Sequence, residues 1–346
     1  MRLKRFSPLL MLILLAVPAF SAEPPRYLEI TFLSTNDTHG RIWPFDAAAN
    51  PGRALPAMPS VAGVARRATI VRQIRAQSTT PVILTDQGDV RGWTALSTAF
   101  NGEVDYDVMS RMGYDAMVPG NHEFELPTAD FMRNVHSSNF PWVCANLVYK
   151  ETGKYVTVPY VIRDVWGVRV ALFGLTNDLP NKQPEYYKGG VETGVFMQPP
   201  IDVAARLVPE LRQQADIVVL LSHLGYREDV KLAQAVPGVD AIFGGHSHSV
   251  ILMPTMVKVR ERTAFDLGAV PVEQAYYNGV FLGKTRMVFR RDPESGRYTL
   301  MSCRGELAKI DASIPDDPEI SGVIRKWEKV RQERVKKAEA ARKPAQ

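Results

Sequence analysis

Most histidines of this chain lie in short motifs whose side chains could bind metal ions. Five of the six histidines fall in such motifs, and each motif follows an apolar run. Carboxylate oxygens, imidazole nitrogens and amide oxygens suit divalent ions such as zinc, manganese and iron. The supply is large enough for two ions. The motifs are Asp37-Thr38-His39, Gly88-Asp89, Gly120-Asn121-His122-Glu123, Ser222-His223 and Gly245-His246-Ser247-His248.

The apolar runs before these motifs predict β-strands, and the segments between them predict helices. Strands are expected over residues 28–34, 82–84, 115–118, 217–221 and 241–243. Helical periodicity predicts helices over residues 61–77, 95–100, 104–112, 124–135, 202–214 and 229–236. This alternation indicates an α/β fold, and the continuous apolar strands indicate sheets covered on both faces. Because loops after such strands converge on one crevice, motifs far apart in sequence can meet there.

The last third of the chain has a different pattern. Residues 272–277, 281–290 and 298–303 alternate like antiparallel strands, which indicates mixed sheets with helices outside them. Two further strand regions are expected at residues 142–145 and in a hairpin over 160–173. A final helix opens at Asp317-Pro318 with an apolar stripe at helical spacing. The stripe, which fades beyond Arg331, consists of Ile320, Val323, Ile324 and Trp327.

The N-terminus predicts an export signal over residues 1–22. Three basic residues precede a short apolar core at residues 8–20, and small residues follow it. The core is too short for a comfortable transmembrane helix, so no stable membrane anchor is expected. The periplasm is the favoured location, with secretion as the alternative. The expected organisation is a signal peptide at 1–22, a catalytic domain at 23–312, and a C-terminal helix with a basic tail at 313–346.

The positive net charge of +5 comes from the two ends of the chain. Residues 325–346 hold nine Lys or Arg and three Glu, so the body between the ends is mildly acidic. This distribution argues against binding of a nucleic acid polymer. The tail is interpreted as a solvated helix end, although its exposure leaves contact with an unknown protein partner open. Cys144 and Cys303 both lie in strand-like contexts and are interpreted as buried thiols, with a disulfide as the alternative in an exported protein.

The ordered motifs resemble the calcineurin-like binuclear metallophosphoesterases. Residues 34–40, 120–124 and 244–248 are similar to the 5′-nucleotidase branch of that family. The resemblance covers about residues 28–330 and corresponds to the catalytic domain. Five motifs in order make it specific, whereas one motif alone would be weak. The resemblance implies a four-layer α-β-β-α sandwich with mixed sheets and a C-terminal helix.

The resemblance also implies a role for each motif residue. One divalent ion (zinc, manganese or similar) would be held by Asp37, His39 and His248. A second ion would be held by Asn121, His223 and His246, and Asp89 would bridge the two. A hydroxide between the ions would be the nucleophile.

Two residues are expected to act on the substrate or through a neighbour. His122 would stabilise charge on the phosphate or protonate the leaving group, and Glu125 would orient it. The family usually has Asp at the position of Glu125, so this longer side chain is a departure. Arg91, close behind Asp89, could touch phosphate or could be a solvated loop residue.

The function implied is that of an exported, metal-dependent phosphoesterase acting on nucleotides or related phosphomonoesters. Cyclic-nucleotide, UDP-sugar and sulfur-ester hydrolysis on the same fold remain alternatives, as does a non-catalytic metal-binding module. Retention of His122, which binds no metal in this scheme, favours an enzyme. The family's nucleotidases usually carry a C-terminal domain that stacks the base, and this chain stops at the helix leading into it. Specificity is expected in loops 41–60 and 178–200 or in that C-terminal domain.

Overall fold

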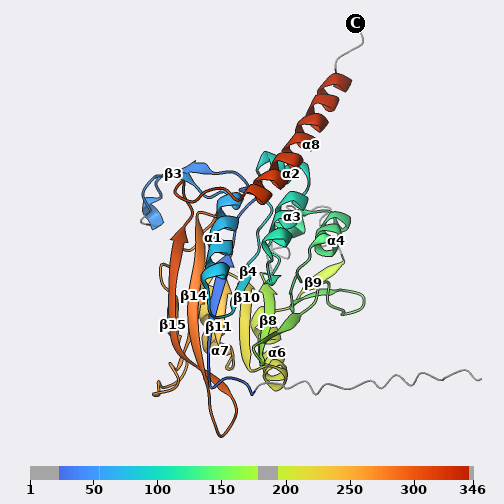
Figure 1. The fold of residues 1–346 in the computed structure, drawn as a ribbon. Coiled ribbons are helices and arrows are strands. Elements are labelled where there is room, and N and C mark those ends of the chain that lie inside the picture. Colours follow the sequence, from blue (N-terminus) through green and yellow to red (C-terminus); the bar gives the residue numbers. More distant parts are fainter. Residues whose placement is uncertain (1–22, 54, 178–193, 343–346) are drawn as a thin grey trace, which may run out of the picture.

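Two mixed β-sheets face each other in the computed structural model, which describes residues 23–53, 55–177 and 194–342. Helices cover the outer faces of both sheets (Figure 1). The expected four-layer α-β-β-α sandwich with a C-terminal helix is therefore confirmed. The predicted export signal and most of the predicted specificity loop 178–200 lie outside the described residues.

The first sheet has five strands, and its parallel part carries three of the motifs. β1 pairs in parallel with β4 and antiparallel with β14, and β4 pairs in parallel with β5. The strands lie in the order β15 (Tyr298–Lys309), β14 (Phe281–Arg291), β1 (Tyr27–Thr35), β4 (Val82–Asp86) and β5 (Ala116–Met117).

The second sheet has six strands and is parallel in its centre, where β8, β10, β11 and β13 run together. Its two edge strands are antiparallel to their neighbours. The order is β12 (Thr255–Lys258), β13 (Ala269–Glu273), β11 (Ala241–Gly244), β10 (Ile217–His223), β8 (Val168–Thr176) and β7 (Tyr160–Val165).

Three apolar layers hold the sandwich together. Between the sheets, aromatic and aliphatic side chains interdigitate, with the rings of Phe32 and Phe243 centred 5.1 Å apart. On the second sheet lie α6 (Pro200–Gln214) and α7 (Tyr226–Ala235). The first sheet is covered by α1 (Val64–Gln77), α2 (Ala95–Ala99), α3 (Glu103–Met112), α4 (Thr128–Ser137) and α8 (Pro318–Arg342).

Helix α8 changes character along its length, as its sequence predicts. Asp317 caps it by accepting a hydrogen bond from the Ile320 amide at 3.0 Å. Ile320 and Ile324 are buried in the core, and Trp327 donates to Asp107 at 2.9 Å. The second half extends away from the body (Figure 1). Within residues 23–53, 55–177 and 194–342, no helix has the length and apolar character needed to cross a bilayer.

Three predicted elements differ in the structure. The helix expected at 124–135 begins at Thr128, after a single 3₁₀ turn, η2 (Glu123–Glu125), because Leu126 precedes a proline and is extended. The strand expected at 142–145 forms only isolated bridges, Met117 to Trp142 and Val143 to Val158. The strand expected at 272–277 runs over 269–273, and Tyr276 has a φ of +68°, which is incompatible with a strand.

Several short elements have no clear sequence signal. They are β2 (Phe45–Ala47), η1 (Pro51–Arg53), β3 (Met58–Val61), β6 (Leu147–Tyr149) and β9 (Val195–Met197). Helices α6 and α7 begin two and three residues earlier than expected, at Pro200 and Tyr226. Both cysteine thiols are free, with Cys144 buried and Cys303 partly buried.

Candidate metal centre

The seven candidate ligands lie at or just beyond the carboxyl ends of parallel strands of both sheets. Five of them have positive φ angles, between +48° and +72°, although none is glycine. Such backbone strain persists only where the surroundings fix it, and it is typical of functional sites. Asp37 and His39 follow β1, Asp89 follows β4, Asn121 follows β5, His223 ends β10, and His246 and His248 follow β11.

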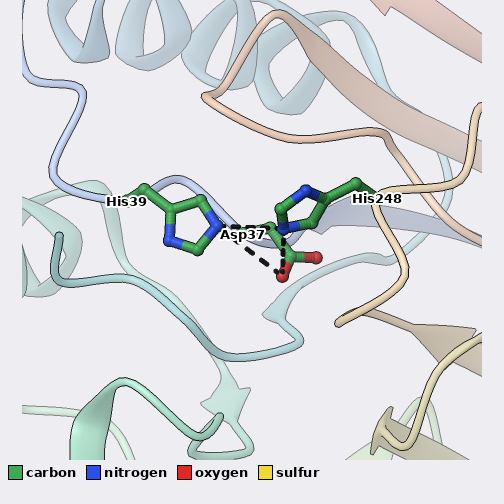
Figure 2. A group of neighbouring side chains, drawn as sticks. All are labelled: Asp37, His39 and His248. Carbon is green, nitrogen blue, oxygen red and sulfur yellow. Dashed lines mark hydrogen bonds and ion pairs between the residues drawn. The ribbon is translucent and has the colours of Figure 1, made fainter. Parts of the chain in front are cut away.

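Asp37, His39 and His248, called here the outer group, point their ligand atoms at one spot (Figure 2). The Nε2 atoms of His39 and His248 are 3.0 Å apart. Asp37 Oδ1 is 3.3 Å from Nε2 of His248 and 4.0 Å from Nε2 of His39. The other carboxylate oxygen of Asp37 accepts from Asn36 Nδ2 at 2.6 Å, which fixes the carboxylate plane.

Asn121, His223 and His246, called here the inner group, form a second cluster. Asn121 Oδ1 is 3.3 Å from His223 Nε2 and 3.0 Å from His246 Nδ1. The other ring nitrogen of His223 donates to the backbone carbonyl of Gln87 at 2.5 Å. This bond leaves Nε2 of His223 directed at the cluster.

Asp89 lies between the two groups. Its Oδ2 is 3.2 Å from His223 Nε2. Asp89 also belongs to a set with His39 and His122 whose ligand atoms all lie within 4.8 Å of one another, as it does with His223 and His246. A carboxylate has two oxygens, so Asp89 can contact a cation on each side.

Close backbone contacts hold the ligand loops together. A Cβ added to Gly120 would lie 2.2 Å from Asp89 Oδ1 and 2.7 Å from a ring carbon of His223. A Cβ on Gly245 would lie 2.6 Å from the Gln87 carbonyl and 2.9 Å from His223 Nδ1. Only glycine fits at these two positions without displacing a ligand.

Buried Glu123 joins the loop after β4 to the loop after β5. Its carboxylate accepts hydrogen bonds from the amides of Asp89, Val90 and Gly120 at 2.9, 2.9 and 2.7 Å. The Tyr106 hydroxyl adds a bond of 3.0 Å. Glu123 therefore fixes the backbone that carries Asp89, a role its position in the motif did not reveal.

His122 faces the site from the side of Asp89. Its Nδ1 is 2.6 Å from Glu125 Oε1, and its Nε2 is 3.9 Å from Asp89 Oδ2. Arg91 is buried, donates to the second oxygen of Glu125 at 2.8 Å, and is not a solvated loop residue. The longer side chain of Glu125 thus contacts an imidazole and a guanidinium at once.

Two aromatic residues absent from the sequence-based site cover the imidazoles of the outer group. Trp93 stacks on His39 with centroids 5.0 Å apart, and Tyr277 stacks on His248 at 4.7 Å. No spacing rule singles out either residue. The one available signal was the place of Trp93 in the loop behind Asp89.

The electrostatics of the site keep two imidazoles neutral. Burial lowers the pKa of His39 and of His246 to about 4 each. Burial also opposes the charge on His223, but Asp89 outweighs it and raises the pKa of His223 to about 10. A cation bound at Nε2 of His223 must therefore displace a proton.

The residues around His122 favour its charged form. Burial acts against the imidazolium, but the bond to Glu125 and the charge of Asp89 raise the pKa of His122. Burial likewise disfavours the Glu125 carboxylate, but His122 and Arg91 lower its pKa. An imidazolium that donates from Nδ1 to Glu125 carries a second proton at Nε2.

The donor set fits a pair of divalent cations. Imidazole nitrogens, carboxylate oxygens and one amide oxygen converge in two groups, and no thiolate among the described residues takes part. Asp89 lies close to His39 of the outer group and to His223 and His246 of the inner group. Nδ1 of His39 is buried without a hydrogen-bond partner among the described residues. No hydrogen bond at Nδ1 therefore accounts for the orientation of this ring, whereas a cation at Nε2 would.

Comparison with known proteins agrees with this geometry. Residues 30–250 match the sequence profile of the family described as calcineurin-like phosphoesterase. The chain belongs to this family. All seven candidate ligands of this calcineurin-like phosphoesterase fall within the matched residues.

The relatives include 5′-nucleotidases. The chain is 31% identical to a 5′-nucleotidase of Vibrio cholerae over 79% of its own length and 51% of the relative, and 32% identical to that of Bos taurus over 91% and 55%. A 5′-nucleotidase precursor of Thermus thermophilus superposes with a TM-score of 0.72 at 28% identity, covering 87% of this chain and 58% of that one. This phosphoesterase thus spans about half the length of the curated relatives it matches.

Proposed function

We propose that the chain is a metal-dependent phosphoester hydrolase that acts on nucleotides or related phosphomonoesters. The observation that carries the proposal is the arrangement around Asp89. Asp89 lies close to His39 of the outer group and to His223 and His246 of the inner group, and Nε2 of His122 is 3.9 Å from Asp89 Oδ2. The 5′-nucleotidases among the relatives support the nucleotide part of the proposal.

In this proposal the outer group, Asp37, His39 and His248, holds one divalent cation. The inner group, Asn121, His223 and His246, would hold the second, and Asp89 would be shared between the two. When bound, the pair of zinc, manganese or similar ions would supply positive charge against the phosphate and lower the pKa of water. The imidazoles of His39 and His246, whose pKa values burial lowers to about 4, present free lone pairs for this purpose, whereas His223 must first lose its Nε2 proton.

His122 then acts on the substrate. Glu125 accepts the Nδ1 proton of His122 and directs Nε2 at the space beside Asp89. The proton on Nε2 can bond to a phosphate oxygen and pass to the departing alkoxide oxygen. Arg91 holds the other oxygen of Glu125, so in this proposal it acts as a positioning residue for His122.

The same proposal covers the cellular location and the domain organisation of the chain. Residues 1–22 direct export, with the periplasm as the favoured destination and secretion as the alternative. Residues 23–312 form the catalytic domain, followed by the helix and basic tail of residues 313–346. The basic, exposed half of α8 is left free to contact another protein.

Phosphate release tests the proposal. AMP and p-nitrophenyl phosphate are supplied to the purified protein with added manganese or zinc, and the rate is compared with that of Asp89→Ala. A loss of at least roughly 100-fold is expected, because the shared ligand of both clusters is removed. Asp316→Ala, which removes an exposed carboxylate, serves as the matched control. Equal rates for the protein and Asp89→Ala would reject the proposed role of the cluster.

A panel of esters separates the related activities. Cyclic nucleotides, UDP-sugars and sulfur esters are tested beside the monoesters under the same conditions. Preference for one of them would redefine the substrate but keep the metal centre. Stoichiometric metal binding with no turnover of any ester would instead identify a non-catalytic metal-binding module.

A further inference from the structure

Trp93 contacts two residues of the site, yet most of its side chain is exposed to solvent. Its indole face stacks on His39, with ring planes 15° apart, and the His122 ring meets it edge-on with centroids 4.7 Å apart. Even so, 65% of the Trp93 surface is exposed. One face of the indole therefore covers two residues of the site, and the opposite side remains open to solvent.

Trp93 lines a cavity of about 580 Å³. This volume lies within the range of small-molecule sites. His39 and His248 of the outer group line it, and Trp93 and Tyr277 add two aromatic walls. Arg41, Thr94 and Asn278 add polar or cationic groups to the lining, and Ala95 adds a small apolar one. Arg41 comes from the segment 41–60 in which the sequence placed specificity.

The position of Trp93 defines what it can contact, provided that the proposed function holds. The phosphate then lies at the two ligand groups, and the departing oxygen lies at His122, which protonates it. Since Trp93 touches both His39 and His122 and lines the cavity beside them, a leaving group that extends from the site into this cavity lies next to the exposed part of the indole. No other described aromatic ring contacts both imidazoles.

We propose that Trp93 is a specificity-determining residue that stacks against a planar aromatic ring in the leaving group of the substrate. The substrate class is therefore a phosphomonoester whose alcohol carries such a ring, of which a nucleoside is the example. Stacking on an aromatic side chain is tolerant of ring identity because every base has a π-face. An alkyl alcohol of similar size lacks this face and gains less from Trp93.

Kinetics on two esters test the proposal. Values of kcat/KM are measured for AMP and for glycerol 2-phosphate, which has no ring. Trp93→Ala is expected to lower the value for AMP roughly ten-fold and that for glycerol 2-phosphate less than roughly two-fold. Trp93→Phe, which keeps a ring, is expected to retain most of the preference for AMP.

A matched control removes another exposed tryptophan far from the site. Trp166 lies at the turn between β7 and β8 and is 59% exposed. Trp166→Ala is expected to leave both kcat/KM values unchanged. Equal losses on the two esters in Trp93→Ala would overturn the proposal, because they would show that Trp93 only supports His39 and His122.

Adenosine binding gives a reading that does not depend on turnover. Calorimetry on the full chain, with and without manganese, is expected to show roughly ten-fold weaker adenosine binding for Trp93→Ala than for Trp166→Ala. Identical binding by the two variants would overturn the role of Trp93. Failure to release phosphate from any ester would reject the proposed function, whereas adenosine binding would still decide whether Trp93 is a stacking surface.

Discussion

One imidazole of the inner group, His223, and one of the outer group, His248, differ in burial and in how firmly they are held. In the inner group, His223 is fully buried and its second nitrogen is bonded to the Gln87 carbonyl. In the outer group, the His248 side chain is 31% exposed, and its ring is covered by Tyr277 only through stacking. His39 has no hydrogen bond at its second nitrogen among the described residues.

This difference has a chemical consequence. A ligand held by a second contact is pre-oriented and binds metal more tightly than one free to rotate. The inner cation is therefore expected to be retained, and the outer cation to exchange more readily. The outer group also borders the cavity beside Trp93, so the more adaptable cation lies on the side where we expect the leaving group.

Removal of one imidazole from each group is the most severe test of this comparison. His223→Ala is expected to lower phosphate release by at least roughly 100-fold and to lose bound metal, because this side chain contacts both Asp89 and Asn121. His248→Ala is expected to lower phosphate release by a factor roughly ten-fold smaller than His223→Ala does. A high metal concentration is expected to restore part of the rate of His248→Ala. Metal content and phosphate release are measured together for both variants.

The opposite order would contradict the comparison. If His248→Ala loses more metal than His223→Ala, burial does not predict which cation is held more tightly. His136→Ala is the matched control, because this histidine lies in α4, outside every ligand cluster. It is expected to keep full metal content.

Substitution of Glu123 tests whether the backbone that this residue fixes stabilises the site. Glu123→Ala leaves several buried amides without an acceptor, and each unsatisfied group costs about 1–3 kcal/mol. The free energy of unfolding in urea is expected to fall by about 3 kcal/mol. Glu123→Gln is not expected to rescue it, because its NH₂ group would face amide donors. Glu306→Ala, which removes an exposed carboxylate, is the control, and an equal loss of stability in both alanine variants would contradict this role.

The sequence predicted the parts of the molecule that depend on local pattern. Strands such as 217–221 are continuous apolar runs, and the motif behind each strand lies at its carboxyl end in the structure. The stripe of α8 likewise predicted its buried half. Short strands such as β6 and β9 escaped because three residues contain no periodicity, and their pairing depends on segments 48 residues apart.

Other parts of the site could not be read from sequence, because they depend on side chains that meet only after folding. Glu123 belongs to a motif that the sequence shows. Its hydrogen bonds, however, are to the amides of Asp89 and Val90, which lie 34 and 33 residues away in the sequence. Trp93 and Tyr277 carry no ligand atom, so no ligand motif includes them. The solvated alternative for Arg91 was wrong, because Glu125 reaches far enough to bind it.

Substitution of Gln274 is expected to affect the inner and outer ligand groups equally. Its amide donates to the Gly245 carbonyl at 2.7 Å and accepts from Ser247 Oγ at 2.9 Å, so it fixes the loop that carries His246 and His248. Gln274→Ala is expected to lower the affinity for both cations by roughly ten-fold, measured by competition with a chelator. Gln214→Ala, on the surface of α6, is the control. Loss of one cation alone would show that the two histidines are held independently.

The smallest expected effect concerns protonation of His122, beside the metal groups. Because Glu125 raises the pKa of His122, Glu125→Gln should lower that pKa while preserving size. The protonated form is lost as pH rises through the pKa, so kcat/KM for AMP should fall at a lower pH in the variant. p-Nitrophenyl phosphate is the internal control, because its leaving group is stable as an anion and needs no proton. A shift of equal size with both substrates would mean that Glu125 acts on the metal groups rather than on proton donation by His122.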